Sequence, residues 1–481
     1  MIARRARAAA TSLVTLVAGH RLFAALLVAA AAVRVVVQVA YRPALFFYGD
    51  SFAYLANAAR LQPEPIRPAG YPAILRALLA VVHNLAVVPA VQHLFGLATG
   101  VLVYALVRRL GAGAAGACVA AAPVLFDAYQ LDIEQHILSE ALFSLLVAGG
   151  LVVLLWRARP SVAACAVAGV LLAAAALTRS VGLALIAPAL AFTIVRGGLV
   201  RSLVLAAAFA LPLVGYAAWY STTPQGRFAL TDHDGFFLYG RVGDFASCQG
   251  LTLSRVDRHV LCDPRPPADR PNPNYYVWHQ WSKHYYPGFA PRTATRNRVL
   301  ESFALDVIRH QPLAYARTVL GDMEHYASFG RSTGRRDEAI GEWQFHVGVP
   351  LTARHVALVT REAHRWGGSV GGRLEAQRLL RAYQRVVFTP GTLLLVALVL
   401  AVAGAAVGAG PGPVRGVRAE MLTLAAAGLL LPLTAAMTSM FDYRYLLPAL
   451  PLLPAAGVLG CSALTARARA LRPAAADPVQ P

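Results

Sequence analysis

Carboxylates stand in a few small groups along a sequence that is otherwise poor in charge. Of the 481 residues, 24 are Asp or Glu, and charged residues make up only 14%. Outside the segment 221–389, acidic residues recur at Asp50 and Glu64, within 127–140, and at Asp442. A carboxylate beside a substrate can accept a proton from an attacking hydroxyl, or orient that hydroxyl through a hydrogen bond. These groups are therefore candidates for acid–base chemistry.

Arginines accompany the carboxylates. Arg42 and Arg67 flank Asp50, Arg179 stands in a short turn between two apolar stretches, and Arg444 opens a later apolar stretch. The planar guanidinium holds a phosphate through two parallel hydrogen bonds. A single arginine at a helix end commonly extends to lipid headgroups instead. Several arginines beside several carboxylates favour a binding site for a membrane-bound phosphate over anchoring alone.

The elements that must position these residues are membrane spans. Hydrophobic residues make up 57% of the chain and the mean hydropathy is +0.53, which excludes a disordered protein and an ordinary soluble enzyme. A helix needs about 20 apolar residues to cross a bilayer. Stretches near that length lie at 22–41, 87–107, 112–128, 138–156, 161–177, 181–195, 202–220, 390–410, 419–439 and 444–462. We therefore expect an all-α polytopic membrane protein with about ten transmembrane helices.

Arginine clusters predict the orientation of these spans. The clusters lie at 4–7, 108–109, 157–159, 196–201, 415–418 and 467–472. Ten spans with both termini in the cytoplasm place every cluster on the cytoplasmic side, as the positive-inside rule requires. The shorter apolar stretch 71–84 would break this pattern as a span, so we expect an interfacial helix there. The first span is interpreted as retained rather than as a signal peptide, because its apolar run is long and contains Arg34.

This topology divides the chain into three parts. Residues 1–220 form an N-terminal transmembrane module with catalytic outer loops at 41–86 and 127–137, and 390–481 form a C-terminal module with a cytoplasmic tail. Residues 221–389 form a mixed extracytoplasmic domain. Its expected elements are short strands or turns at 227–245, helices over 293–329 with a break at 310–312, and two amphipathic helices around a glycine-rich hinge at 367–372.

Cysteine usage supports the outward placement of that domain. Cys248 and Cys262 are the only pair in a soluble segment, whereas the other three cysteines lie in or beside spans. A disulfide between the pair suits an oxidising compartment. Two unpaired loop thiols are the alternative. No cysteine or histidine grouping has the spacing of a metal site.

Five short motifs resemble the GT-C glycosyltransferases, which are integral-membrane enzymes that use polyprenyl-phosphate sugars. The motifs are YGDSFAY (48–54), RPAGYP (67–72), ILSEALF (137–143), LTRSVG (177–182) and YRYLLP (443–448). The resemblance covers residues 20–220 and 390–460. Within the superfamily, these segments resemble protein O-mannosyltransferases and aminoarabinose transferases. The segment 221–389 looks like the outer domain of actinobacterial phospholipid-carrier-dependent members. O-mannosyltransferases usually carry His where Arg67 stands here, so the acceptor need not be a protein.

The resemblance implies an inverting single displacement at the extracytoplasmic face of the plasma membrane. A sugar would pass from a polyprenyl-phosphate carrier to a hydroxyl of a cell-envelope glycan, lipid or protein. Asp50 is the expected base, and Glu140 is the second carboxylate, which orients the acceptor or the sugar. The donor phosphate is assigned to Arg444, Arg179, Arg42 and Tyr445, and contacts to the acceptor or sugar are assigned to Glu134, Asp132, His136, Tyr54 and Arg67.

Arginines alone can hold a monophosphate leaving group, so no cofactor is required. A divalent metal held by Asp50 and Glu134 is the alternative, because related enzymes that use pyrophosphate carriers do use one. The expected partners are the lipid-linked donor, membrane lipid and the acceptor. Nucleic acid is not expected despite a net charge of +20, because no basic run is interleaved with aromatic residues.

Two other classes of function remain open. A transporter or lipid flippase should place ionisable groups near mid-bilayer in broken helices, yet only Arg34 lies deep in a predicted span. A scaffold protein would use 221–389 as a binding module. It would give no reason for the charged residues near the outer ends of the spans. The sequence identifies neither the sugar nor the acceptor, and it leaves the oligomeric state open.

Overall fold

The computed structural model describes residues 19–224, 226–278, 294–348, 353–407 and 416–471, and these are predominantly helical. Within them, the sheet consists of two strands, β1 (Tyr41–Arg42) and β2 (Gly371–Gly372), which pair antiparallel. Helices suit the long apolar segments, because a helix satisfies its backbone hydrogen bonds without water. The predicted all-α class is confirmed.

The N-terminal transmembrane module contains one helix or bent helix for each predicted span. Its members are α2 (Arg21–Ala40), α5 (Val87–Arg109), α6 (Ala114–Phe126), α8 (Glu140–Leu155), α9 (Val162–Thr178), η1 (Ser180–Leu185) followed by α10 (Ile186–Gly197), and α11 (Leu199–Ser221). Three shorter helices lie in the two loops that the predicted topology places outside the membrane: α3 (Tyr48–Arg60), α4 (Gly70–Val81) and α7 (Ala128–Gln135). Helix α4 is the element predicted as interfacial.

The C-terminal module consists of α19 (Gly391–Val407), α20 (Arg418–Thr438), η5 (Tyr443–Ala449) and α21 (Leu453–Ala470). Small residues let α19 and α21 approach closely. A Cβ atom at Gly460 would collide with the Leu400 carbonyl oxygen, and one at Gly457 would lie 2.6 Å from Ala397. Such contacts are typical of helix pairs inside a bilayer, where close van der Waals packing drives association.

Length and composition allow five to eight crossings among the described helices. Five helices are long and apolar enough, and three bent pairs bring the number up to eight. The bent pairs are α6 with α7, α18 with α19, and η5 with α21. Helices α8 and α9 coincide with the fourth and fifth predicted spans but are shorter, at 16 and 17 residues. The protein is therefore a polytopic membrane protein, and the count of ten stays a prediction.

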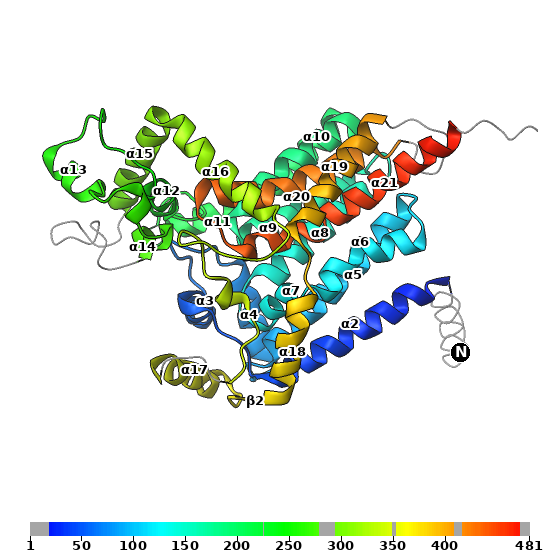
Figure 1. Ribbon diagram of the computed structural model, residues 1–481, viewed down its shortest axis with the longest axis horizontal. Coiled ribbons are helices and arrows are strands. Elements are labelled where there is room, and N and C mark those ends of the chain that lie inside the picture. Colours follow the sequence, from blue (N-terminus) through cyan, green and yellow to red (C-terminus); the bar gives the residue numbers. More distant parts are fainter. Residues whose placement is uncertain (1–18, 225, 279–293, 349–352, 408–415, 472–481) are drawn as a thin grey trace, which may run out of the picture.

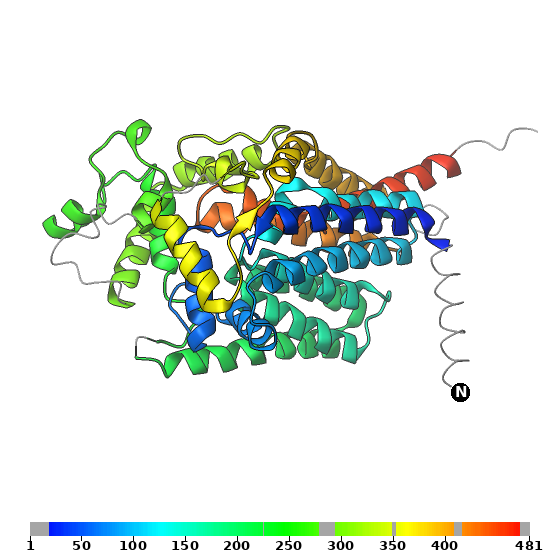
Figure 2. The same ribbon diagram turned by 90° about the horizontal axis from the view of Figure 1, so that it is seen from below.

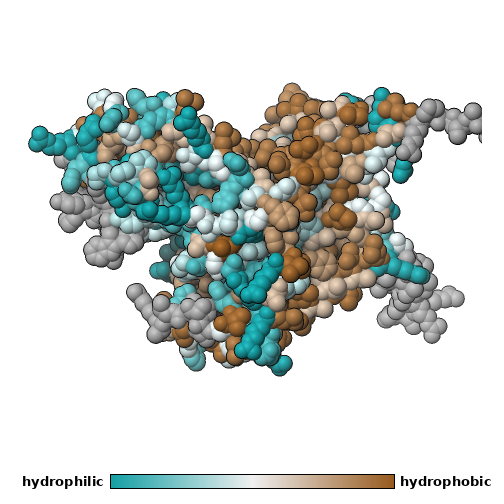
Figure 3. Space-filling model, viewed as in Figure 1, coloured by the Kyte–Doolittle hydropathy of each residue, from teal (hydrophilic) through white to brown (hydrophobic). Residues whose placement is uncertain are grey.

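The first and last helices that the structure describes have their terminal ends on the same side of the molecule, far from the domain 221–389. Helix α2 begins and α21 ends at one end of the molecule, whereas α12 to α15 lie at the other end (Figures 1 and 2). The space-filling view shows hydrophobic side chains over the bundle and hydrophilic ones over the outer helices (Figure 3). The predicted cytoplasmic placement of both termini stays a prediction. Part of its support, the arginines at 4–7 and Arg415 and Arg472, lies outside the described residues.

The described part of the domain 221–389 consists of helices joined by loops, together with strand β2. Its elements are α12 (Asp234–Gly243), α13 (Arg255–Leu261), η2 (Pro267–Asp269), α14 (Pro273–Trp278), α15 (Ala294–His310), α16 (Pro312–Tyr326), η4 (Ile340–Trp343), α17 (Ala353–Trp366) and α18 (Leu374–Val386). The predicted break near 310–312 is confirmed, because Pro312 occupies the first position of α16, where its missing N–H costs nothing. The amphipathic pair around 367–372 is also confirmed, as α17 and α18.

Of the short strands or turns predicted at 227–245, no strand forms. Helix α12 replaces them over Asp234–Gly243, whereas the residues on either side form bends and turns. Phe236, Tyr239 and Val242 recur every three residues and are buried together against α14 and α15. The aromatic and glycine content suggested strands, but the three-residue spacing is helical. Strand structure at the outer side is limited, among the described residues, to the β1–β2 pair.

Cys248 and Cys262 form a disulfide that ties the segment before α13 to its end, with Cα atoms 6.1 Å apart. We expect non-reduced peptide mapping by mass spectrometry to find the two cysteine peptides linked. Replacing both residues by serine should lower the free energy of unfolding of the outer domain by about 3 kcal/mol, because the unfolded chain loses a restraint. Free alkylation of both thiols in protein purified without reductant would contradict this pairing and the outward placement of the domain.

Candidate active site

One cavity of about 1340 Å³ lies where the first outer loop, the spans and the outer domain meet. It is larger than the roughly 300–1,000 Å³ of sites for a single drug-sized ligand. Its wall includes residues of α3, η1, α20, η5, α12 and α14, so all three parts of the chain contribute. The volume leaves room for two substrates side by side.

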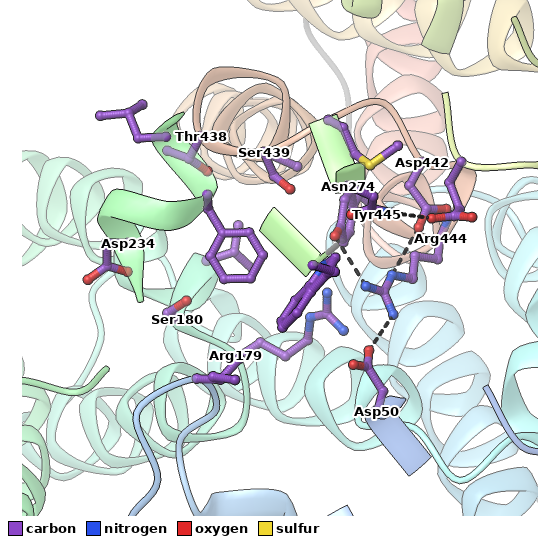
Figure 4. Close-up of a pocket in the computed structure, with 18 of the residues that line it drawn as sticks. Asp50, Arg179, Ser180, Asp234, Asn274, Thr438, Ser439, Asp442, Arg444 and Tyr445 are labelled. Carbon is purple, nitrogen blue, oxygen red and sulfur yellow. Dashed lines mark hydrogen bonds and ion pairs between the residues drawn. The ribbon is translucent and has the colours of Figure 1, made fainter. Parts of the chain in front are cut away.

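Arg444, at the start of η5, lies at the centre of the charged part of this cavity (Figure 4). Asp442 caps η5 by accepting a hydrogen bond from the Arg444 backbone N–H at 2.9 Å, and its second oxygen lies 3.0 Å from Arg444 Nε. Arg444 Nη1 donates to Asp50 Oδ2 at 3.0 Å, and Nη2 donates to the Tyr445 hydroxyl at 3.2 Å. The guanidinium plane is therefore fixed before any ligand binds.

Aromatic rings surround the same guanidinium. Its Cζ atom lies 5.0 Å from the ring centroid of Phe47, 5.6 Å from that of Trp343 and 5.1 Å from that of Tyr445. Cations are attracted to the faces of such rings, and partial exclusion of water strengthens the attraction. These rings lower the local dielectric around Arg444, which increases its attraction for an anion.

Asp50 lies in the first turn of α3 and forms ion pairs with Arg67 and Arg444. Burial alone would raise the pKa of Asp50, but the two arginines outweigh burial and hold this pKa well below its ordinary value. The carboxylate is therefore ionised at neutral pH in this arrangement. Arg67 also lies 3.5 Å from Glu64, so the ion pairs form a chain of alternating charge.

Arg179 is a further cation of the cavity wall. It ends α9, and its Nη1 contacts Glu140 Oε1 at the start of α8. Glu140 is 1% exposed, and the same oxygen lies 3.8 Å from Arg444 Nη1. Arg179 Cζ lies 5.6 Å from the Tyr445 ring centroid. Glu140 thus lies behind both arginines and orients them, rather than lining the cavity itself.

The structure brings six of the predicted site residues to the cavity wall. These are Asp50, Tyr54, Arg67, Arg179, Arg444 and Tyr445. Tyr54 is anchored by a 3.2 Å hydrogen bond between its hydroxyl and that of Ser139, directly before Glu140. Arg42 is not brought there, because it is exposed and lies in β1 opposite Gly371.

Glu134 is buried inside the transmembrane bundle, away from the cavity wall. Both of its oxygens pair with Arg34, at 2.8 and 3.0 Å, and His93 Nδ1 lies 2.9 Å from Oε2. Gln130 donates to Oε1 at 3.1 Å. This network ties α2 and α5 to α7. Its contacts are those of a structural anchor, which differs from the predicted contact to an acceptor or sugar.

We expect Glu134→Ala to lower the thermal stability of the detergent-purified protein strongly. Removing one partner of a buried pair costs about 3–5 kcal/mol, since Arg34 would be left buried without its counter-charge. Arg42→Ala is the control: Arg42 is exposed, so its removal should change the melting temperature little. Equal melting temperatures for the two variants would show that the Arg34–Glu134 pair does not anchor the bundle.

Asp132 and His136 also lie outside the cavity wall. Both are buried, and His136 Nδ1 lies 3.4 Å from Asp132 Oδ2 and 2.9 Å from the Asp132 carbonyl oxygen. The His136 ring packs against Trp343, with centroids 6.0 Å apart. Their placement supports the wall from behind, under the tryptophan that contacts Arg444.

Sequence reasoning missed the residues that the outer domain contributes. Glu338 lines the cavity and accepts a 2.5 Å hydrogen bond from the Asn274 side-chain amide. Burial and the nearby Asp442 raise the pKa of Glu338 to about 7, against a smaller opposing effect of Arg444. No motif marks Glu338, Asn274 or Trp343 in the sequence, because Glu338 stands in a loop and the helices of Asn274 and Trp343 are only 6 and 4 residues long, too short to show a period.

The candidate metal ligands do not fit a metal. The carboxylate oxygens of Glu134 contact Arg34, His93 and Gln130, and the carboxylate of Asp50 forms ion pairs with two arginines. Among the described residues, no group of three or more His, Cys, Asp or Glu side chains is placed to hold a metal ion. These two carboxylates therefore hold arginines in place, and they lie in separate networks rather than in one ligand set.

Comparison with known proteins gives a structural likeness. No protein-family model matches the sequence. No curated protein matches it either. Among solved structures, the crystal structure of ArnT from Cupriavidus metallidurans bound to undecaprenyl phosphate is similar to this chain. The alignment covers 92% of this chain and 77% of that chain, with 16% sequence identity and a TM-score of 0.33.

Proposed function

We propose that this protein is a membrane glycosyltransferase that moves a sugar from a polyprenyl-phosphate carrier to a hydroxyl of an extracytoplasmic acceptor. The observation that carries the proposal is the placement of Arg179 and Arg444 together in one large cavity with an apolar wall on the membrane side. A lipid phosphate has the two chemical parts that such a cavity can bind.

The two arginines suit a phosphate leaving group. Each is held by a carboxylate, Arg444 by Asp442 and Arg179 by Glu140, so their donors are in place before the reaction. Preorganised positive groups stabilise charge that develops on a leaving oxygen without reorganising at that moment. The Tyr445 hydroxyl lies beside Arg444 and adds a further hydrogen-bond donor.

The apolar wall suits a prenyl chain. Val181, Leu183 and Ala184 of η1 line the cavity, together with Leu431 and Ala435 of α20. These two elements contact one another, and α20 is one of the helices long enough to span a membrane. A carrier lying at headgroup depth would place its chain along this wall and its phosphate at the arginines.

The chemistry then follows from the arrangement. The acceptor oxygen forms a bond to the anomeric carbon as the bond from that carbon to the phosphate oxygen breaks, which inverts the configuration. Asp50 accepts the proton of the attacking hydroxyl. Arg444 and Arg179 take up the charge of the released polyprenyl phosphate. Glu140 acts through the arginines that it holds. No metal is needed in this scheme.

The test is transfer by the full-length protein in lipid nanodiscs. Polyprenyl phosphates carrying a radiolabelled hexose or pentose are incubated with cell-envelope acceptors, and both the labelled product and free polyprenyl phosphate are measured. We expect both to appear in equal amounts. If none of the lipid-linked sugars binds, the proposal is excluded. Movement of the carrier across proteoliposomes without cleavage would identify a flippase instead.

A further inference from the structure

The cavity has a second face, away from the charged centre, and its composition differs from that of the centre. This face comes from the outer domain, and we name it the outer shelf. It consists of Asp234 and Phe237 of α12, Asn272 and Trp278 at the two ends of the α14 region, and Glu301 of α15. In Figure 4, Asp234 lies on the far side of the drawn residues from Arg444 and Asp50.

We infer that the outer shelf binds the acceptor and that this acceptor is a neutral saccharide, a conclusion that rests on the proposed glycosyl transfer. The aromatic side chains Phe237 and Trp278 are the first reason. Their rings lie 5.8 Å apart at an interplanar angle of 76°, and the His233 ring lies 5.6 Å from the indole at an angle of 24°. The rings are partly buried on the core of the outer domain, so their positions are fixed.

Fixed aromatic rings at a cavity wall suit a sugar ring. The C–H face of a pyranose or furanose is apolar and slightly positive, and the face of an aromatic ring is negative. Stacking therefore binds the sugar face without hydrogen bonds. The hydroxyl groups at the sugar edge remain free for polar side chains around the rings.

The polar members of the outer shelf supply those contacts. Asn272 Oδ1 accepts from the Tyr275 backbone N–H at 3.2 Å, which leaves its amide N–H groups as donors. Asp234 is exposed and accepts from Thr231 at 3.1 Å, and Glu301 has no hydrogen bond or ion pair within the described residues. Carboxylates accept from sugar hydroxyls and an amide donates to them, so both properties of a hydroxyl are met.

The charges of the outer shelf disfavour an anionic acceptor. Its two carboxylates would repel a phosphate or a carboxylate group. Among the described outer-domain residues that line the cavity, carboxylates outnumber arginines: Asp234, Asp269, Glu301 and Glu338 stand against Arg265 and Arg335. Arg265 is also paired with Asp263. A neutral polyhydroxylated ligand fits this set better than a phospholipid headgroup.

The experiment measures saccharide binding directly, without requiring transfer. Full-length protein in nanodiscs is titrated with short neutral oligosaccharides of mannose, galactose, glucose and arabinose, and saturation-transfer difference NMR reports contacts to their ring protons. We expect at least one oligosaccharide to bind. Trp278→Ala and Phe237→Ala should each weaken its affinity about tenfold, the factor that corresponds to loss of one stacked ring.

Matched variants separate a binding role from a folding role. Phe228→Ala removes an aromatic ring of the same domain that is 65% exposed and lies outside the cavity wall, and it should leave saccharide affinity unchanged. Trp278→Phe keeps a ring and should retain part of the affinity. If Trp278→Ala lowers the yield of folded protein, Glu301→Gln is measured in its place. It removes a charged hydrogen-bond acceptor and should weaken saccharide affinity.

Two results would overturn the inference. One is failure of every oligosaccharide to bind, or binding that Trp278→Ala, Phe237→Ala and Glu301→Gln leave unchanged. The other is binding of unglycosylated Ser/Thr peptides at the shelf in place of saccharides. Retention of labelled polyprenyl phosphate is measured on the same samples. Saccharide binding without lipid binding would support the outer shelf as a saccharide site and reject the proposed transfer. Lipid binding without saccharide binding would reject only the role of the outer shelf.

Discussion

Arg444→Ala should weaken the binding of polyprenyl-phosphate sugar by a factor of about 30 or more. Truncating one partner of a buried, hydrogen-bonded charge pair costs roughly 2–5 kcal/mol. Asp442, the Tyr445 hydroxyl and the rings of Phe47, Trp343 and Tyr445 hold the Arg444 guanidinium in one orientation. Its N–H donors are therefore in position before the phosphate binds. The measurement is the dissociation constant of a radiolabelled donor for detergent-purified protein.

A structural role for Arg444 is the competing explanation, because the variant also leaves Asp442 buried without its partner. Arg331→Ala is the matched control. The Arg331 side chain is also largely buried, pairs with Asp127 at 3.2 Å and packs on the Tyr129 ring at 4.2 Å, but it does not line the cavity. Both variants should melt at lower temperature. Only Arg444→Ala should lose donor affinity per folded molecule.

Lysine separates charge from geometry at the same position. Arg444→Lys keeps the positive charge but presents it as a point, so it cannot make two parallel hydrogen bonds to phosphate. We expect a donor affinity between those of the wild type and Arg444→Ala. Donor affinity equal to wild type in Arg444→Ala would remove this residue from the phosphate site.

The spans and the charged centre of the cavity could be predicted because their signals are local. A run of apolar residues near bilayer length specifies a helix without reference to the rest of the chain. Arg179 and Arg444 stand at the ends of such runs and Asp50 follows the first run at a distance of nine residues, so a common topology brings them to one end of the bundle. The helical pattern of α15 and α16 is likewise carried by their own sequence.

Glu134 shows what such local signals miss. In the sequence it resembles its neighbours Asp132 and Glu140, and the shared pattern predicts all three near substrate. Its partner Arg34 stands 100 positions earlier, inside the first span, and nothing in either stretch indicates the pairing. Once the bundle is packed, the carboxylate neutralises an arginine that would otherwise be buried alone.

The outer domain shows a second limit. Phe237, Trp278 and Glu338 meet the cavity only because α12, α14 and the loop before η4 pack around it. Their spacing in sequence reflects loops of irregular length rather than a helical or strand period. A single sequence reveals periods and motifs, and neither applies to residues that two short helices and a loop bring together.

Asp50→Asn should reduce transfer by about 10²–10⁴-fold, the usual contribution of a general base. The amide keeps the shape and one acceptor oxygen toward Arg67 and Arg444, so expression and donor binding should persist. Glu64→Gln is the control, since Glu64 also pairs with Arg67 but does not line the cavity. Turnover near wild type in Asp50→Asn would reject Asp50 as the base.

The ion pairs of Asp50 add a pH signature to this prediction. In the free protein, Arg67 and Arg444 hold the pKa of Asp50 well below its ordinary value, which makes it a weak base. A lipid phosphate that binds Arg444 withdraws one of these two cations from Asp50, so the pKa of Asp50 rises in the complex. The acid limb of kcat, which reports the complex, should therefore lie at higher pH than that of kcat/KM, which reports the free protein. Coincident acid limbs would mean that the donor does not compete for Arg444, and that the base and the phosphate site are separate.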